Sequence, residues 1–442
     1  MVVEVLKGKK VAFFTLGCKL NFAETSTIGL RLEELGAERV RSAAQADLCV
    51  VNTCSVTEVA DRKGRQLIHK LHKDNPYAVI AVTGCYAQLK PTVIQDIDGV
   101  EVVVGAINKS SFVDKILEHL NLSANLISSD SKDSNSQLSI SSFFSSCSRG
   151  DRTRYFLKVQ DGCDYFCTYC TVPYARGRSR NGSIESIIKQ AQAVADAGGK
   201  EIVITGVNTG DFGRSTGETF FQLIQQLDTI TGIERYRISS IEPNLLTDEM
   251  IDFCASSRAF MPHFHIPLQS GSDTVLRLMQ RRYTTDDFRR KIEKVHSVMP
   301  DAFIGIDVIV GMRGETDPLF EETYQFMNDL SFSQLHVFSY SERLNTKALE
   351  IPYAVPSTTK HERSQRLLAL SEKKLHDFYS RFVGTQRPVL LEHSSQIQKP
   401  MNGFTDNYIK VEIENHPELD NHIVMARLGA FTDNGNLLCS LA

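Results

Sequence analysis

The stretch Tyr155-Phe-Leu-Lys-Val-Gln-Asp-Gly-Cys163-Asp-Tyr-Phe-Cys167-Thr-Tyr-Cys170 decides the architecture of this 442-residue chain. An apolar, strand-like run is followed at once by three cysteines in a CxxxCxxC spacing. Three thiolates on one tight loop leave a coordination position open, whereas structural zinc normally takes four ligands. Cysteine thiolates also hold iron–sulfur clusters, and a 4Fe–4S cluster on three cysteines has one iron free for a ligand. The alternative, a zinc knuckle with a distant fourth ligand, is disfavoured because no partner CxxC pair exists elsewhere.

Six strand candidates lie between Tyr155 and Ser339, with amphipathic helical stretches such as Ile184–Ala197 and Phe320–Leu330 between them. The candidates are Tyr155–Val159, Glu201–Thr205, Tyr236–Ser240, His263–Pro267, Ile304–Val310 and Gln334–Ser339. The alternation predicts either a doubly wound sheet or a partial (β/α) barrel, and alternation alone does not separate the two.

The first 120 residues alternate in the same way, which predicts an open parallel α/β sheet covered on both faces. The apolar runs are Val11–Leu16, Leu48–Val51, Ala78–Val82 and Val100–Val104, and the helix-like stretches are Ala23–Leu35, Val59–Leu71 and Phe112–Leu120. Three of the runs are each followed by a cysteine, namely Cys18, Cys54 and Cys85. Because the carboxyl ends of parallel strands meet at one edge, the three thiolates are expected to converge there. The alternative is that small residues simply suit strand-to-helix turns.

The rest of the chain divides by composition. Residues 121–149 hold twelve serines and predict a flexible linker or insertion. A charged helical stretch at Lys360–Phe382 precedes short β-like runs that predict a small antiparallel barrel or sandwich. These runs are Pro388–Glu392, Tyr408–Ile413 and Ile423–Leu428. The expected domains are therefore 1–120, 121–149, 150–383 and 384–442.

Bulk composition narrows the class of protein. Apolar residues make up 42% and charged residues 23%, as in ordinary globular proteins, and the net charge is −4. No signal peptide and no run of about 18 apolar residues is present, so a cytoplasmic protein without a membrane span is expected. Ten cysteines in such a protein argue for metal or catalytic use rather than disulfides.

Other residues allow two interpretations each. The loops Thr205–Gly210 and Gly311–Thr316 follow strands and could approach a small polar ligand, although plain loops fit equally well. His263 and His265 share one face of a strand, where a buried, satisfied pair is favoured over metal ligation. The basic patch Arg176–Arg180 could contact a phosphate backbone or form a solvated charged face.

With these residues in view, the chain resembles the radical-SAM methylthiotransferases over nearly its whole length. The cysteine loop matches the radical-SAM cluster motif, and Tyr169 matches the aromatic position beside its third cysteine. The segments Leu16–Asn21 and Pro173–Arg180 look most like the branch that acts on threonylcarbamoyladenosine at tRNA position 37. Further family-like words are Ile-Thr-Gly-Val-Asn-Thr-Gly, Ile-Pro-Leu-Gln-Ser-Gly-Ser and Met279-Gln-Arg-Arg-Tyr283.

The resemblance implies an N-terminal cluster domain, a central partial (β/α)6 radical-SAM barrel and a C-terminal TRAM-like β domain. It implies two 4Fe–4S clusters, one on Cys18, Cys54 and Cys85 and one on the loop cysteines. S-adenosylmethionine would contact a set of five residues. They are Tyr169, Thr205, Gly206, Gln269 and Gly311. The implied reaction is methylthio transfer to C2 of the modified adenosine.

The expected partners are a tRNA anticodon stem-loop and a flavodoxin- or ferredoxin-type electron donor, with the protein acting as a monomer. A threonylcarbamoyl group carries a carboxylate, so its site is expected to hold a cationic side chain. The substrate-binding candidates are Arg176, Arg178 and Arg281. The alternatives are a methylthiotransferase on isopentenyladenosine tRNA or on a ribosomal-protein aspartate. An alternative of another class is a metal-stabilised RNA-binding protein without turnover.

Overall fold

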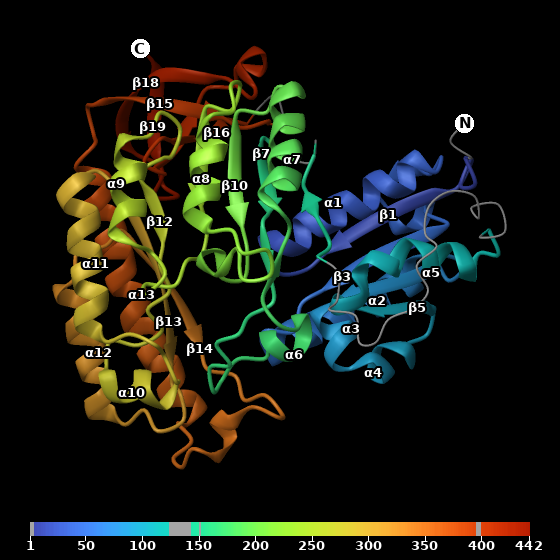
Figure 1. Cartoon of the computed structure of the whole chain (residues 1–442), viewed down its shortest axis with the longest axis horizontal. Helices are drawn as coiled ribbons and strands as arrows, with labels where there is room; N and C mark the ends of the chain where they lie inside the picture. Colours follow the sequence, from blue (N-terminus) through green and yellow to red (C-terminus); the bar gives the residue numbers. More distant parts are fainter. Residues whose placement is uncertain (1–3, 123–142, 150–151, 395–398) are drawn as a thin grey trace. The chain divides into compact units, whose positions relative to one another are not determined.

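The computed structural model describes residues 4–122, 143–149, 152–394 and 399–442 (Figure 1). The chain divides into two compact units. The first consists of Met1–Arg149, Asp161–Asp164 and Cys170–Gly182, and the second of Gly150–Gln160, Tyr165–Tyr169 and Ser183–Ala442. Within the described ranges, none of the helices combines the length and apolar character that crossing a membrane requires.

A five-stranded parallel sheet forms the centre of the first unit, in the order β2-β1-β3-β4-β5. The strands are β1 (Lys10–Thr15), β2 (Glu38–Val40), β3 (Leu48–Thr53), β4 (Val79–Gly84) and β5 (Val100–Gly105). The helices are α1 (Lys19–Glu34), α2 (Glu58–Asp74), α3 (Cys85–Leu89), α4 (Pro91–Gln95) and α5 (Phe112–His119). Leu48–Thr53 is buried along its whole length, as expected for a central strand covered on both faces. The predicted open parallel sheet is confirmed.

Two hydrophobic cores lie on opposite faces of this sheet. Apolar side chains of α2, α3 and α4 pack on one face, and those of α1 and α5 pack on the other. The sequence analysis missed the short strand β2 and the helices α3 and α4, each of which has six residues or fewer. A five-residue helix spans less than two turns, which is too short for a helical pattern, and β2 reads Glu-Arg-Val, with a single apolar residue.

The serine-rich segment falls mostly outside the described residues, so its predicted flexibility stays a prediction. Its described end, residues 143–149, forms β6 (Ser146–Cys147) against α1. The Cys147 amide donates to Thr27 Oγ1 at 3.2 Å, and the Arg149 amide donates to Ser26 Oγ at 3.0 Å. Cys147 is buried.

The second unit contains six parallel strands in two adjoining stretches, β7-β10-β11 and β12-β13-β14. A parallel bridge between Tyr236 and Phe260 joins the stretches. The strands are β7 (Arg154–Lys158), β10 (Glu201–Thr205), β11 (Arg235–Ile238), β12 (His263–His265), β13 (Phe303–Val310) and β14 (Gln334–Ser339). All six predicted strands are confirmed within a few residues at their ends. Their sequential order is that of the partial (β/α)6 barrel.

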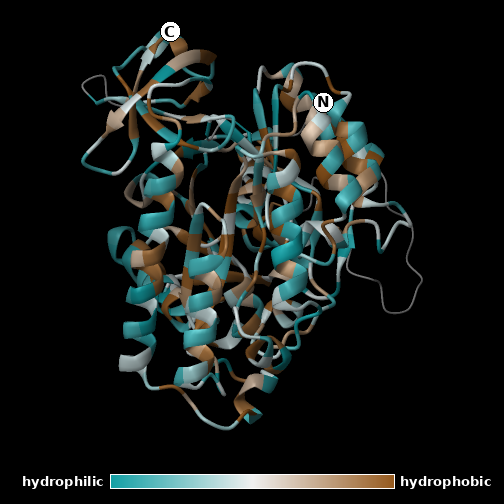
Figure 2. Ribbon diagram, turned by 90° about the vertical axis from the view of Figure 1, so that its left-hand side faces the viewer, coloured by the Kyte–Doolittle hydropathy of each residue, from teal (hydrophilic) through white to brown (hydrophobic). Residues whose placement is uncertain are grey.

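Helices follow these strands and cover their outer side. They are α7 (Ile184–Asp196), α8 (Phe220–Asp228), α9 (Asp248–Ser256), α10 (Asp273–Leu278), α11 (Thr285–Val298), α12 (Asp317–Asp329) and α13 (Ser357–Ser380). Figure 2 shows hydrophobic residues concentrated on the strands and polar residues on the outer helices. The cysteine segment itself carries only short elements, β8 (Gln160–Asp161), α6 (Val172–Arg176) and β9 (Arg180–Asn181).

The C-terminal residues form a closed barrel in the order β15-β16-β17-β19-β18. The strands are β15 (Gln386–Leu391), β16 (Met401–Thr405), β17 (Lys410–Ile413), β18 (Ile423–Phe431) and β19 (Leu437–Leu441). The predicted small barrel is confirmed, with one parallel pair, β17–β19, among antiparallel ones. Its core continues into aromatic side chains at the end of α13, so barrel and helix share one hydrophobic cluster.

Candidate functional site

The three N-terminal cysteines lie at the ends of three neighbouring strands. Cys18 caps α1 after β1, Cys54 follows β3, and Cys85 follows β4. A Cβ atom built on Gly17 would lie 3.0 Å from the Cys54 Sγ, so the Cys54 side chain lies directly against the residue before Cys18. The structure therefore brings these thiols together at the edge where the strand pattern placed them.

Side-chain amides connect the three cysteine-bearing turns. Asn21 Nδ2 donates to the carbonyl oxygens of Leu16, at 2.7 Å, and Thr53, at 3.1 Å, which precede Cys18 and Cys54. The third turn joins through Thr53 Oγ1, which donates to the Thr83 carbonyl at 2.6 Å. Gly84 has φ 106°, and a Cβ there would lie 2.3 Å from the Thr53 oxygen, so only glycine fits before Cys85.

A buried network of charges lies beneath these turns. Arg176 Nη1 donates to Glu24 Oε1 at 3.0 Å and to Asp161 Oδ1 at 2.9 Å, and its Nη2 donates to Asn21 Oδ1 at 2.6 Å. Lys109 Nζ forms an ion pair with Glu24. Arg180 Nη2 lies 3.1 Å from Asp161 Oδ2. Each of these charged side chains is at most 5% exposed.

By formal charge this network has three cationic side chains and two carboxylates, one positive charge in excess. Burial lowers the pKa of Lys109, and its ion pair with Glu24 opposes that shift. Burial chiefly, and then the nearby Cys85 and Cys18, raise the pKa of the Cys54 thiol to about 12. Burial also raises the pKa of Cys85, against which Arg176 and Lys109 act. For Arg176 itself, burial lowers the pKa, but the carboxylates of Glu24 and Asp161 outweigh it and hold the pKa well above its usual value. Clustered thiols with a cationic surplus are suited to an anionic, thiolate-bound centre.

The chemistry of the donor set fits an iron–sulfur cluster. Cys18, Cys54 and Cys85 offer three thiols at the ends of neighbouring strands, and cysteine thiolates are the ligands that hold such clusters.

The loop cysteines have hydrogen-bond donors of their own. Cys163 and Cys170 belong to the first unit and Cys167 to the second. In the first unit, the Val172 amide donates to the Cys170 Sγ at 3.4 Å. In the second, Arg281 Nη1 lies 3.0 Å from the Cys167 Sγ. Burial raises the pKa of Cys167, and Arg281 opposes that rise, so both donors favour the thiolate form that a cluster needs.

Two of the three predicted substrate-binding arginines are engaged in the interior. Arg176 is 3% exposed within the Glu24–Asp161 network, and Arg281 is 3% exposed beside Glu242 and Cys167. Burial of Arg176 does not fit a contact with an exposed phosphate backbone, whereas the predicted contact of Arg176 or Arg281 with a substrate carboxylate stays a prediction. Arg178 is different, since its side chain is 74% exposed and lies 3.4 Å from Asp164. Only this member of the predicted basic patch has the exposure that an RNA contact requires.

The residues expected to contact S-adenosylmethionine have varied surroundings. Tyr169 packs on a small core cluster of the second unit, and Gly311 has φ 75° with Lys360 against it. Thr205 ends β10, and a Cβ on Gly206 would lie 3.1 Å from Gln160 Oε1. That oxygen already accepts hydrogen bonds from the amides of residues 207 and 208, at 2.9 and 3.0 Å. The group that packs closely against the Gly206 backbone in this structure is therefore the Gln160 side chain.

Gln269 stands out by its backbone. It has φ 75°, a region that non-glycine residues rarely adopt, and it pairs with β13 through Asp307 and Ile309. Such conformations persist where the surrounding structure enforces them, often at functional sites. The predicted role of Gln269 in cofactor binding remains a prediction with this feature in its favour.

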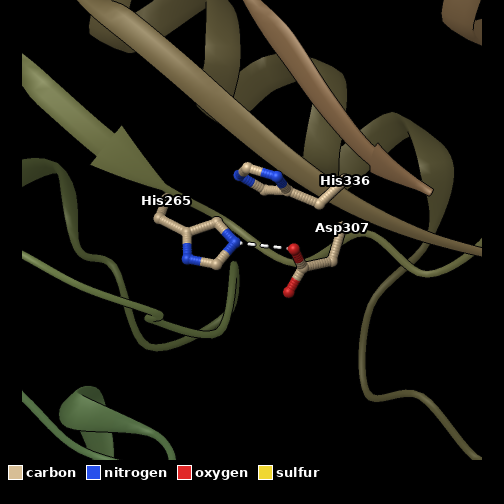
Figure 3. Close-up of side chains that lie close together, drawn as sticks. All are labelled: His265, Asp307 and His336. Atoms are coloured by element: carbon tan, nitrogen blue, oxygen red, sulfur yellow. Dashed lines mark hydrogen bonds and ion pairs between the residues drawn. The ribbon is translucent and has the colours of Figure 1, made fainter. Parts of the chain in front are cut away.

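Several site residues were missed by sequence reasoning. Glu24 lies in the predicted helix Ala23–Leu35, whereas Asn21 and Lys109 lie outside the predicted elements, and no sequence signal showed that the three side chains are buried. The sequence analysis considered His263 and His265 but not Asp307, the residue that His265 contacts. His263 is buried between Phe303 and Tyr408, whereas His265 Nε2 lies 2.7 Å from Asp307 Oδ1, with His336 beside it (Figure 3).

Comparison with known proteins gives consistent matches along the chain. The Radical SAM superfamily matches residues 157–327, and Uncharacterized protein family UPF0004 matches residues 10–105. The chain is 40% identical to the threonylcarbamoyladenosine tRNA methylthiotransferase of Bacillus subtilis, over 95% of this chain and 93% of that protein. It is 35% identical to the enzyme of the same name from Aquifex aeolicus, over 93% and 98%.

A solved structure shares the fold at low sequence identity. The radical S-adenosylmethionine methyltransferase TsrM from Kitasatospora setae has a TM-score of 0.54 and 13% identity, over 75% of this chain and 72% of that one. At this identity the likeness concerns the fold alone.

Proposed function

We propose that this chain, which belongs to the radical-SAM methylthiotransferase family in the branch of the threonylcarbamoyladenosine tRNA methylthiotransferases, adds a methylthio group to C2 of threonylcarbamoyl-modified adenosine next to the anticodon. The observation that carries the proposal is the presence of two separate three-cysteine sets in a chain that matches these enzymes over nearly its full length. One set suits S-adenosylmethionine binding at an open iron, and the other suits sulfur delivery.

The cofactors are two 4Fe–4S clusters and S-adenosylmethionine. The six cysteines are the proposed ligands of the two clusters. When bound, they supply the one-electron and sulfur-transfer chemistry that acid–base groups cannot provide at an unactivated aromatic carbon. The protein's own residues set the surroundings. Arg281 and the Val172 amide donate to Cys167 and Cys170, and hydrogen bonds of this kind to cluster sulfurs tune the reduction potential.

At the second cysteine set, the proposed task of the protein is to hold three turns in register around an anionic centre. Asn21 fixes the turns before Cys18 and Cys54, and Arg176 fixes Asn21. The surplus positive charge of the network stabilises the negative charge of thiolates and sulfide.

The remaining partners are proposals from chemistry. Reductive cleavage needs one electron at a time, which a flavodoxin- or ferredoxin-type donor provides. A tRNA substrate places the enzyme in the cytoplasm, where we expect it to act as a monomer. Of the basic residues predicted at the RNA surface, Arg178 is the one whose exposure supports the role.

The decisive test uses two matched tRNA anticodon stem-loops, one threonylcarbamoylated and one isopentenylated. The reconstituted enzyme receives each with S-adenosylmethionine and a reductant, and the digested nucleosides are analysed by mass spectrometry. We expect methylthio addition to the threonylcarbamoylated loop only. Preference for the isopentenylated loop, or turnover only on a ribosomal protein, would move the chain to another branch. Zinc without iron in the purified protein would favour an RNA-binding protein without turnover.

A further inference from the structure

Three polar side chains converge on three neighbouring strands of the half-barrel, one from each strand. His265 ends β12, Asp307 lies within β13, and His336 lies within β14 (Figure 3). Their ligand-type atoms all lie within 4.8 Å of one another, which is true of no other His, Cys, Asp or Glu triplet in the described ranges. Neither the cysteine sites nor the predicted cofactor contacts include any of them.

Strand register explains why the three meet. Asp307 is directly opposite His336, and His265 is opposite Gly305, two residues before Asp307. Side chains two residues apart on a strand share a face, so all three point the same way. Gly305 leaves that face open, because a Cβ there would lie 3.6 Å from His336 Nε2 and 3.8 Å from the His265 ring. The alternate residues of β13, such as Ile304 and Ile306, are fully buried on the other face.

The triplet is fixed on one side and accessible on the other. His265 Nε2 lies 2.7 Å from Asp307 Oδ1, and the two imidazole rings meet edge to face with centroids 5.2 Å apart. The side chains of His265 and Asp307 are 21% and 18% exposed, and His336 is exposed. By contrast His263, one position along the same face of β12, is buried between aromatic rings. A purely structural pair has no need of this opening.

The arginines first considered for the substrate carboxylate are held elsewhere. Arg176 is paired with Glu24 and Asp161, and Arg281 is paired with Glu242. A carboxylate that enters a protein site needs charged or hydrogen-bonding partners. The His336 imidazole offers such a donor on an accessible face, and the second oxygen of Asp307 can accept a hydrogen bond.

We propose that His265, Asp307 and His336 form the subsite that binds the threonylcarbamoyl group of the substrate adenosine. This inference rests on the proposed function and specifies how the substrate is recognised. His336 donates to the carboxylate, His265 holds Asp307 in place through their hydrogen bond, and the second oxygen of Asp307 accepts from the hydroxyl or the carbamoyl N–H. An isopentenyl group offers neither a carboxylate nor a hydroxyl to these side chains. Sites built for hydrogen bonds reject analogues that lack them, in known cases by roughly 10⁴- to 10⁵-fold.

A single metal ion on the same three residues is the competing occupant. Two histidines and one carboxylate are a known set of metal ligands. The geometry favours the subsite, because the 2.7 Å contact of His265 with Asp307 is a direct hydrogen bond. The proton that it requires occupies the direction in which a metal would bind that nitrogen.

The test compares anticodon stem-loops that carry threonylcarbamoyladenosine or its methyl ester, in which the carboxylate charge is masked. Affinity is measured by fluorescence anisotropy, and kcat/KM by mass spectrometry. For His336→Ala and Asp307→Asn we expect both quantities to fall by roughly 10- to 100-fold on the free acid, the value of one charge-assisted hydrogen bond. On the methyl ester, His336→Ala should change either quantity less than about threefold. His336→Gln, which keeps a donor, should recover part of the loss.

Matched controls separate recognition from folding. His296→Ala removes a histidine from the outer helix α11, where its Nε2 lies 3.3 Å from the Ser331 carbonyl, and should behave as the wild type on both loops. Iron content and cleavage of S-adenosylmethionine without RNA should be retained in every variant. If His336→Ala loses these, His336→Gln carries the same comparison.

The outcomes distinguish this inference from the proposed function. If the wild type methylthiolates the isopentenylated loop and binds acid and ester equally, both the proposed function and the subsite are contradicted. If the wild type is active on the threonylcarbamoylated loop, but the variants lose the same affinity and kcat/KM on acid and ester, only the subsite is contradicted. One equivalent of a non-iron metal that is present in the wild type and absent from His336→Ala would also overturn it in favour of a metal site.

Discussion

The two cysteine sets of this chain are built in opposite ways. Cys163, Cys167 and Cys170 lie within eight residues of one loop, so chain connectivity alone keeps their sulfurs close. Cys18, Cys54 and Cys85 are spread over 68 positions, from residue 18 to residue 85 counted inclusively, and meet only because β1, β3 and β4 are neighbours in a parallel sheet. The second arrangement therefore depends on tertiary structure, and the first depends mainly on local sequence.

The surroundings follow the same division. The N-terminal set rests on side chains drawn from three separate parts of the sequence, among them Asn21, Lys109 and Arg176. At the loop set, a backbone amide two residues away donates to Cys170, and Arg281 donates to Cys167. A centre assembled from distant segments should be lost through changes far from its ligands, whereas a local motif should tolerate them.

Removal of one whole set should have the largest effect. The wild type reconstituted without oxygen should hold about eight irons, and replacement of either cysteine triplet by alanine should leave about four. The Cys18/Cys54/Cys85→Ala protein should still cleave S-adenosylmethionine but form no methylthio product. Iron analysis and product analysis measure both. A full iron complement after loss of Cys163, Cys167 and Cys170 would contradict the two-site assignment.

Arg176→Met should be next in size. It leaves the buried carboxylates of Glu24 and Asp161 without a shared partner, and breaking a buried ion pair in this way costs about 3–5 kcal/mol. We expect a lower unfolding temperature and loss of the N-terminal cluster before the other. The matched control is Arg178→Met, two residues away and 74% exposed, which should change stability by less than about 0.5 kcal/mol. Equal destabilisation by both variants would refute the buried network's role.

Asn21→Ala should have an intermediate effect. The change removes the amide that bridges the Leu16 and Thr53 carbonyls, and an unsatisfied buried group costs about 1–3 kcal/mol. In a protein that already lacks Cys163, Cys167 and Cys170, the remaining iron should be lost faster to a chelator. Asn108→Ala, at an exposed position of the same unit, is the control. Unchanged iron retention would show that the turns hold without this bridge.

Arg178→Ala should have the smallest effect, on RNA binding alone. If this exposed arginine contacts a phosphate, its loss should reduce the slope of log affinity against log salt by roughly 0.7–0.9. A salt series with a labelled anticodon stem-loop measures the slope. No change in slope would return Arg178 to a solvated surface paired with Asp164.

Sequence patterns predicted most of the fold because apolar runs alternate with amphipathic stretches along it. Four strands of the first sheet and all six of the half-barrel were found, whereas β2 (Glu38–Val40), which has one apolar residue, and the five-residue helix α4 were missed. The cysteines could be grouped because strand ends of a parallel sheet share an edge. What the pattern could not supply was burial of charge. Arg176 and Arg178 look alike in sequence, and only the packed structure separates an interior ion pair from an exposed side chain.

The triplet of His265, Asp307 and His336 was hidden for a similar reason. Its members lie on three strands separated by dozens of residues, and only the strand register aligns them. The glycine at position 305, which leaves room for both rings, has no meaning until its neighbours across the sheet are known.

The assignment of residues 170–182 to the first unit limits how such proteins can be recombined. A chimera joined at position 149 would pair one parent's Glu24 and Lys109 with the other parent's Arg176 and Asp161. Sequence exchange between relatives should succeed only when the crossover carries the segments on both sides of the serine-rich stretch together. The segments that must be exchanged together to keep the N-terminal site are therefore discontinuous in sequence, and they include part of the other cysteine motif.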